Sequence, residues 1–174
     1  MSEDSLLLQF YSGRSPDVRG RTIEQIWQQD YEWLEQTHDY IQWLFPLNEK
    51  SRFNPNAPLL TKTDIQAFKD NANLRKNLIQ SFKLMLDFYG LKIQVTQEGN
   101  ETITTSESFL KRKQNWVNWG NHNYLRITRI LKCLKILGIA DYAQAFFQCL
   151  SEIYVTEKGE ITKLTFSYWQ EAVE

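Results

Sequence analysis

The sequence predicts an all-α fold: a single-domain bundle of six or seven helices over residues 1–174, with a short β-hairpin or extended flap near residues 91–104. Three observations support this class. Apolar residues recur at spacings of three and four along most of the chain, as they do on the buried face of a helix. Alternation of apolar and polar residues is confined to one short stretch, residues 91–95. A chain of 174 residues with 42% apolar residues can also bury one ordinary core.

The first part of the chain predicts an irregular arm followed by one long helix. Residues 1–21 contain turn-forming residues and are expected to lie over the core as an N-terminal arm. Thr22 and Gln25 match a capping box, which marks the start of a helix. Pro46 ends this helix because proline lacks an amide donor and disfavours helical geometry in the residue before it. The apolar stripe of this helix comprises Trp27, Tyr31, Leu34, His38, Ile41 and Phe45.

The remainder of the chain predicts shorter helices joined by connections of a few residues. An extended connection reaches Leu60, after which Thr61 or Thr63 caps a short helix. Gly90 follows a strongly periodic helix at the position of a left-handed C-terminal cap. The later helix boundaries fall at Ser106 or Ser108, at the Gly120-Asn121 corner, at Gly138 and at Asp141, and a final helix carries Leu164 to Val173.

Several classes of protein are disfavoured by what the sequence lacks. No apolar run reaches the roughly 18 to 20 residues of a spanning helix, and the first residues have no signal-peptide pattern. We therefore expect a soluble intracellular protein, placed in the cytoplasm, with no membrane span. Cys133 and Cys149 lie in apolar stretches without metal or redox spacing, so they are expected to be reduced core thiols. Without a phosphate loop, nucleophile elbow or metalloprotease motif, the sequence favours a non-enzymatic domain with no cofactor and no metal.

Charge is distributed unevenly, although the net charge is only -1. Residues 22–49 carry six acidic and no basic side chains, whereas residues 108–140 carry seven basic and no acidic ones. Pairing between these segments within the fold is the preferred explanation, with exposed pairs contributing about 0.2 to 1 kcal/mol each. The candidate pairs join Glu35 or Asp39 to Arg126 or Arg129.

Two alternative functions follow from the same residues. The basic segment 108–135 is interleaved with aromatic residues, so it could act as a nucleic-acid-binding module that contacts phosphates and stacks on bases. His38 and His122, the only two histidines, could instead form a metal-dependent enzyme site with Asp39. Against the second alternative, His38 falls on the apolar helix face, where a hydrogen-bonded core histidine is expected, and His122 stands where a helix cap is expected.

Four long strings point to a known family. They are DYEWLEQTHDYIQWLFPL (residues 30–47), LTKTDIQAFK (60–69), LMLDFYG (84–90) and HNYLRITRILKCLKILG (122–138). These strings closely resemble the conserved region of the opioid growth factor receptor family, and the similarity runs in order from about Phe10 to the C-terminus. The resemblance is to a compact member of the family, without the C-terminal tail or repeats.

The resemblance implies an all-helical domain and brings no established catalytic residues. Animal members of the family are soluble, nucleus-associated proteins that bind an enkephalin peptide and restrain cell proliferation, so it implies a peptide or protein ligand and nuclear association. The polar positions carried over by motif, together with Trp43, are His38, Tyr40, Gln42, His122, Asn123, Arg126, Thr128 and Arg129. We expect the two strings that contain them to share a shallow pocket for a carboxylate-bearing peptide, because arginines offer charge-assisted donors. The ligand and the oligomeric state stay open.

Overall fold

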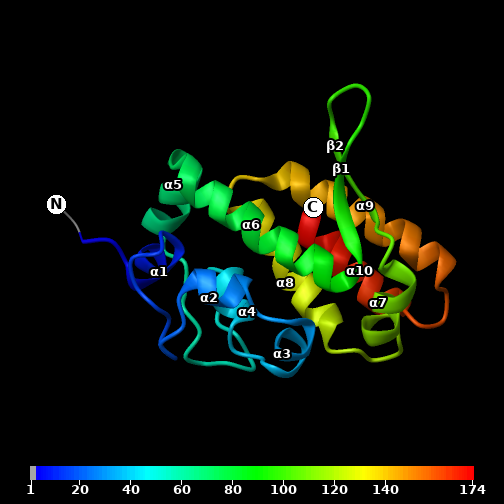
Figure 1. Ribbon diagram of the computed structural model, residues 1–174, viewed down its shortest axis with the longest axis horizontal. Coiled ribbons are helices and arrows are strands. Elements are labelled where there is room, and N and C mark those ends of the chain that lie inside the picture. The colour runs from blue at the N-terminus through cyan, green and yellow to red at the C-terminus, as the bar shows by residue number, and fades with distance from the viewer. Residues whose placement is uncertain (1–2) are drawn as a thin grey trace. The chain divides into compact units, whose positions relative to one another are not determined.

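The computed structural model describes residues 3–174, which fold mostly as helices together with one antiparallel hairpin (Figure 1). Within this range six helices have eight or more residues and four are shorter, so the predicted helical class is confirmed. The chain divides into two compact units, one comprising the residues up to Phe82 with Ile136–Gly138, and the other Lys83–Lys135 with Ile139–Glu174. No helix among residues 3–174 is long and apolar enough to cross a membrane.

The first unit begins with a helix that the sequence pattern did not predict, α1 (Leu6–Tyr11). The Ser5 side chain caps it by accepting a hydrogen bond from the amide three residues on. Phe10 and Tyr11 are fully buried, and the Tyr11 hydroxyl donates to the carbonyl oxygen of Leu44 at 2.6 Å. The predicted irregular arm is therefore wrong over these residues, because six residues are too few to reveal helical periodicity.

The predicted long helix over residues 22–45 is also wrong. The chain instead forms α2 (Ile23–Trp27), α3 (Tyr31–Gln36) and α4 (Ile41–Leu44). The capping box at Thr22 is present as predicted. However, the Asp30 side chain starts a new helix by accepting from the amide of Trp33 at 2.8 Å, and Thr37 adopts extended geometry that ends it. Local side-chain caps thus override the helical spacing of the apolar residues.

The connection to α5 (Lys62–Asp70) is tied to the core at Leu47. The amide of Leu60 donates to the carbonyl oxygen of Leu47 at 2.9 Å. Thr61 then caps α5 in a capping box with Asp64, which confirms one of the two predicted caps. This arrangement leaves residues 48–58 as a surface loop with fixed ends.

The long helix α6 (Ala72–Tyr89) ends at Gly90, which has a φ of +79°. Only glycine adopts this left-handed geometry without strain, so the predicted C-terminal cap is confirmed. The next helix, α7 (Phe109–Trp116), passes directly against this glycine. A Cβ atom at residue 90 would lie 2.7 Å from the Cα atom of Phe109 and 2.9 Å from the Cβ atom of Arg112.

Two side chains of α7 bond to the last carbonyl groups of α6. Arg112 donates from Nε to the carbonyl oxygen of Phe88 at 2.8 Å, and its guanidinium lies 5.0 Å from the centre of the Phe88 ring. Trp116 donates from Nε1 to the carbonyl oxygen of Tyr89 at 3.0 Å. These bonds use carbonyl groups that a helix end leaves without an intrahelical partner.

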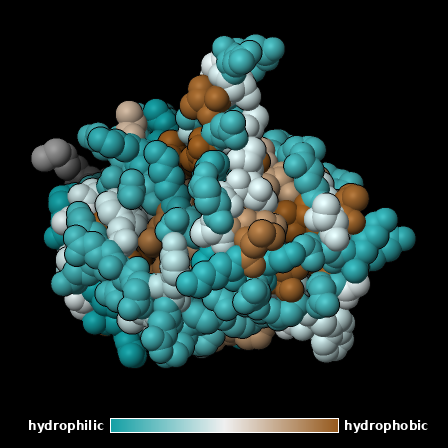
Figure 2. Space-filling model, turned by 45° about the vertical axis from the view of Figure 1, so that its right-hand side comes forward, coloured by the Kyte–Doolittle hydropathy of each residue, from teal (hydrophilic) through white to brown (hydrophobic). Residues whose placement is uncertain are grey.

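The hairpin consists of β1 (Leu91–Val95) and β2 (Glu101–Thr105), with Ile93 opposite Ile103. It matches the predicted hairpin near residues 91–104. Strand β2 packs against α9 (Ala140–Thr156), which supports a pair of strands that would be marginal alone. The turn stands out from the surface with a hydrophilic tip (Figure 2).

The second unit is completed by α8 (Asn123–Ile136) and α10 (Lys163–Val173). Trp169 of α10 is fully buried and donates from Nε1 to the carbonyl oxygen of Tyr124 at 3.2 Å. Its ring also meets the Tyr124 ring edge to face, at 5.6 Å between centroids. Gly138, the predicted stop after α8, has a φ of +91°.

Cys133 and Cys149 are both free and buried, as predicted. Burial raises the pKa of Cys149 to about 12, with a further contribution from Glu152, and burial raises the pKa of Cys133 as well. Since the thiolate is the reactive form, neither thiol should react measurably with Ellman's reagent at neutral pH in the folded protein. Two thiols per chain should react after unfolding in guanidinium chloride. Rapid reaction of either thiol without denaturant would contradict its burial.

Candidate functional site

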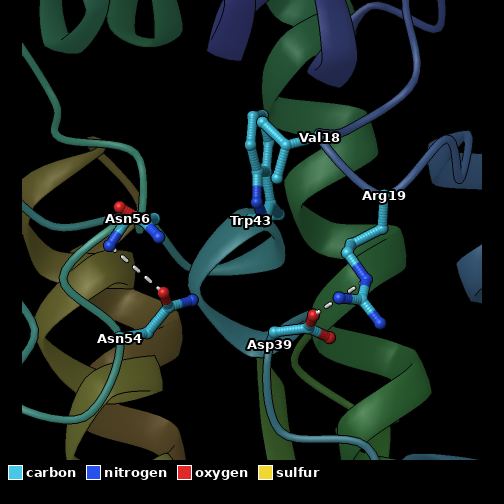
Figure 3. A pocket seen from close by; sticks show the side chains of 6 residues that line it. All are labelled: Val18, Arg19, Asp39, Trp43, Asn54 and Asn56. Atoms are coloured by element: carbon cyan, nitrogen blue, oxygen red, sulfur yellow. Dashed lines mark hydrogen bonds and ion pairs between the residues drawn. The ribbon is translucent and has the colours of Figure 1, made fainter.

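A surface depression of about 170 Å³ lies in the first unit, where three loops meet. Its lining residues are Val18, Arg19, Asp39, Trp43, Asn54 and Asn56 (Figure 3). Asp39 and Trp43 come from the string of residues 30–47, which also carries the candidate residues predicted from the sequence. The other four lining residues lie outside the two strings that carry the predicted site residues, 30–47 and 122–138.

The wall formed by Val18 and Arg19 is built around a buried carboxylate, that of Asp17. This side chain accepts hydrogen bonds from the backbone amides of Arg19 at 2.9 Å and Arg21 at 3.0 Å. Gly20 closes the turn with a φ of +79°. Because the carboxylate holds the loop from inside, Val18 and Arg19 point outward and are 66% and 69% exposed, respectively.

A network of two arginines and two aspartates extends from this loop into the depression. Arg21 donates from Nε to Asp17 at 2.8 Å and from Nη1 to Oδ1 of Asp39 at 2.9 Å. Burial favours a lower pKa for Arg21, but the hydrogen bonds and charges of the two carboxylates outweigh it and hold this pKa above its ordinary value. Arg19 reaches the other oxygen of Asp39, Oδ2, with a longer Nε to Oδ2 distance of 3.5 Å.

The indole of Trp43 lies between the ionic wall and the asparagine wall (Figure 3). Trp43 is only 3% exposed and packs edge to face against Phe10, at 5.2 Å between centroids. On the far side, the Asn54 side chain accepts from the amide of Asn56 at 3.2 Å and donates to Oε1 of Gln42 at 3.5 Å. The depression therefore combines an aromatic edge, amide groups and a surface ion pair.

The other residues predicted from the first string have different environments. Tyr40 is fully buried, and its hydroxyl donates to the carbonyl oxygen of Leu34 at 2.8 Å. Its ring packs against the ring of Trp33, so Tyr40 stabilises the fold and does not line the depression. Gln42 is buried beside Asn54. His38 is exposed in the connection between α3 and α4. The predicted core histidine is therefore wrong, because the helix that would have turned His38 inward is interrupted there.

The residues predicted from the second string lie at the start of α8, in the second unit. Asn123 is fully buried, and Arg126 is 6% exposed with its Nη1 atom 3.4 Å from Oδ1 of Asn123. His122 is exposed in the preceding turn, and the side chain that accepts from the amide of Asn123 belongs to Asn121, at 2.9 Å. Asn121 thus contributes a cap at this helix start, and a capping role for His122 stays a prediction. A pocket shared by the two strings stays a prediction.

The basic segment 108–135 is less available to phosphates than its composition indicates. Arg112 and Arg126 are buried, and Lys113 lies 2.5 Å from a carboxylate oxygen of Glu157. Three of the seven positive charges are thus engaged within the second unit, which weakens the nucleic-acid alternative. Among residues 3–174, no group of three His, Cys, Asp or Glu side chains is placed to hold a metal ion.

Comparison with known proteins identifies the family to which the chain belongs. The chain is 42% identical to the human opioid growth factor receptor over 120 residues, which cover 69% of this chain and 17% of that protein. It is 41% identical to opioid growth factor receptor-like protein 1 of Xenopus tropicalis over 139 residues, 78% of this chain and 26% of that protein. The chain thus spans about a sixth to a quarter of the length of these relatives, and no solved structure matches it.

The match to the family model covers more of the chain than the alignments with single relatives do. The model of the opioid growth factor receptor conserved region matches residues 1–174, the whole of the chain. The four strings that suggested this family lie within that match. The chain belongs to the opioid growth factor receptor family.

Proposed function

We propose that this chain is a non-enzymatic interaction domain that holds a peptide segment of another molecule in the depression beside Trp43. The main support is the composition of the depression, which places an aromatic edge, two asparagines and an ion pair around one opening. Peptides present apolar side chains together with backbone donors and acceptors, and such a mixed lining suits them. A relative named as a growth factor receptor is consistent with a peptide ligand.

Rigid support of the loops also favours binding. The carboxylate of Asp17 orders the Val18 loop, and the Asn54 side chain orders the opposite loop. Loops held on a rigid scaffold commonly carry binding residues, and preorganisation lowers the entropy lost on association. Exposed apolar side chains stand on both loops, Val18 in the lining and Phe53, 79% exposed, next to Asn54. A peptide bound there would cover apolar surface that is now open to water.

The proposal predicts a specific loss of binding on substitution of Val18. Peptides selected from a random display library against the intact chain should bind Val18→Glu at least about tenfold more weakly, because the glutamate places an unpaired charge in the contact. Val155→Glu is the matched control, since Val155 has a similar exposure of 61% but lies on α9 of the second unit. Isothermal titration calorimetry measures both affinities. Equal binding to both variants and the native chain would refute the proposed site.

The same selected peptides test the residues predicted from the two strings. His38→Ala should weaken binding if the peptide extends along the first string, and His122→Ala and Arg129→Ala should weaken it if the second string takes part. Unchanged affinity in the latter two variants, with loss in Val18→Glu, would confine binding to the first unit. Such a result would remove the predicted shared pocket and retain the interaction domain.

A further inference from the structure

The two arginines that share Asp39 are held very differently. Arg21 is 18% exposed and is fixed by Asp17 as well as by Asp39, with its guanidinium 5.5 Å from the centre of the Trp33 ring. Arg19 is 69% exposed and meets Asp39 at 3.5 Å. An exposed pair of this kind contributes little to stability, because water screens both charges. Arg21 is therefore part of the scaffold, whereas Arg19 can leave Asp39 at little cost.

Removal of Arg19 from the depression would change its charge balance. The network contains two arginines and two aspartates, so it is neutral while Arg19 lies against Asp39. Once Arg19 turns outward, the three side chains that remain carry one negative charge in excess, which lies nearest the partly exposed carboxylate of Asp39, still bonded to Arg21. The vacated position would then attract another cation.

The groups around that position suit a guanidinium. A planar guanidinium pairs well with a carboxylate, and the carboxylate of Asp39 lines the depression where Arg19 already meets it (Figure 3). A volume of about 170 Å³ is smaller than the roughly 300 to 1,000 Å³ of whole-ligand pockets, so it suits one side chain of a larger ligand. Arg19 itself already supplies a guanidinium at this place.

We propose that Arg19 is an internal placeholder, and that an arginine side chain of the bound peptide replaces it against Asp39 in the depression beside Trp43. This inference rests on the proposed function and names the side chain that the depression recognises. Exchange of one guanidinium for another keeps the network neutral, so Asp39 is paired in both states. The peptide would therefore compete with Arg19 for a single carboxylate.

Competition with Arg19 gives an unusual expectation, since removal of a positive residue should strengthen binding of a positive peptide. The probe is the capped tripeptide acetyl-Gly-Arg-Gly-amide, titrated by NMR while the amides of Val18 and Asn56 and the indole N–H of Trp43 are followed. Arg19→Ala should bind it about two to five times more tightly than the native chain, because a larger fraction of the molecules then has the position open. Arg14→Ala, which removes an equal charge from another exposed pair, should leave the affinity unchanged.

Two further probes identify the recognised group. The same tripeptide with citrulline, which is neutral and nearly isosteric, should bind at least about tenfold more weakly, because it lacks the charge that pairs with Asp39. Gly-Gly-Gly-amide with a free amino terminus supplies only an amino-terminal cation and should also bind more weakly. Equal binding of citrulline or Gly-Gly-Gly, or no gain of affinity in Arg19→Ala, would overturn the placeholder. If library peptides without arginine still lose affinity in Val18→Glu, the proposed function stands and this inference alone fails.

Discussion

Replacement of Gly90 by alanine should lower the free energy of unfolding by about 2 to 5 kcal/mol, as measured by equilibrium urea denaturation. A left-handed backbone costs an alanine about 1 to 2 kcal/mol relative to glycine. The new methyl group would also lie 2.7 Å from the backbone of Phe109, and forced overpacking of this kind costs about 1 to 3 kcal/mol more. Because the obstructing atom is part of the backbone, α7 would have to shift away from the end of α6.

The matched control for this substitution is Gly99→Ala in the hairpin turn. Gly99 has nearly the same backbone geometry, with a φ of +84° against +79°, but a Cβ atom added there would have no other atom within 4 Å. We expect a loss of about 1 to 2 kcal/mol from backbone strain alone. If both alanine variants lost the same stability, close packing of α7 on Gly90 would not be the cause of the larger effect.

Asp17→Ala should lower the free energy of unfolding by about 3 to 5 kcal/mol and disorder the Val18 wall of the depression. The Asp17 side chain is fully buried, and its removal leaves Arg21 with half of its carboxylate partners and two backbone amides without their acceptor. Loss of one partner from a buried ion pair costs about this much, since the remaining charge stays desolvated. Urea denaturation gives the stability, and the NMR signals of Val18 and Arg19 report on the loop.

Two control variants identify the cause of the loss of stability. One keeps the shape of the Asp17 side chain without its charge, and the other removes an exposed ion pair elsewhere. Asp17→Asn retains an oxygen that can accept from the amides, so it should lose less stability than alanine. Asp4→Ala breaks the exposed pair with Arg14 and should change stability by about 0 to 1 kcal/mol. An Asp17→Ala variant as stable as Asp4→Ala would show that the buried network does not hold the loop.

Long periodic segments and glycine stops were predictable from the sequence, whereas short helices were not. The helix that ends at Gly90 and the hairpin after it each combine a strong local pattern with a matching turn residue. Residues 22–45 show a helical stripe, yet Asp30 and Thr37 break it through local hydrogen bonding and extended geometry. A side-chain cap contributes on the order of 1 kcal/mol, and here such caps accompany the division of one predicted helix into three short ones.

The candidate site was predictable only in part, because the contacts that create it join loops that are distant in sequence. Trp43 was among the positions carried over by the family motif, and it does line the depression. Arg19 and Asn56 carried no signal beyond turn-forming neighbours, since the ion pair of Arg19 with Asp39 spans twenty residues of chain. Burial of Asp17 was equally hidden, because an aspartate in a turn is usually solvated.

The hairpin turn has a practical consequence for work on this protein. Residues 97–100 are exposed, and the turn is closed by its own backbone hydrogen bonds, from Thr96 to Asn100 at 2.8 Å and from Gly99 to Thr96 at 2.9 Å. Loop tips of this kind tolerate inserted sequence, because few contacts are lost there. An epitope or a fluorophore-bearing cysteine placed after Glu98 would report on the second unit while the peptide assays monitor the first.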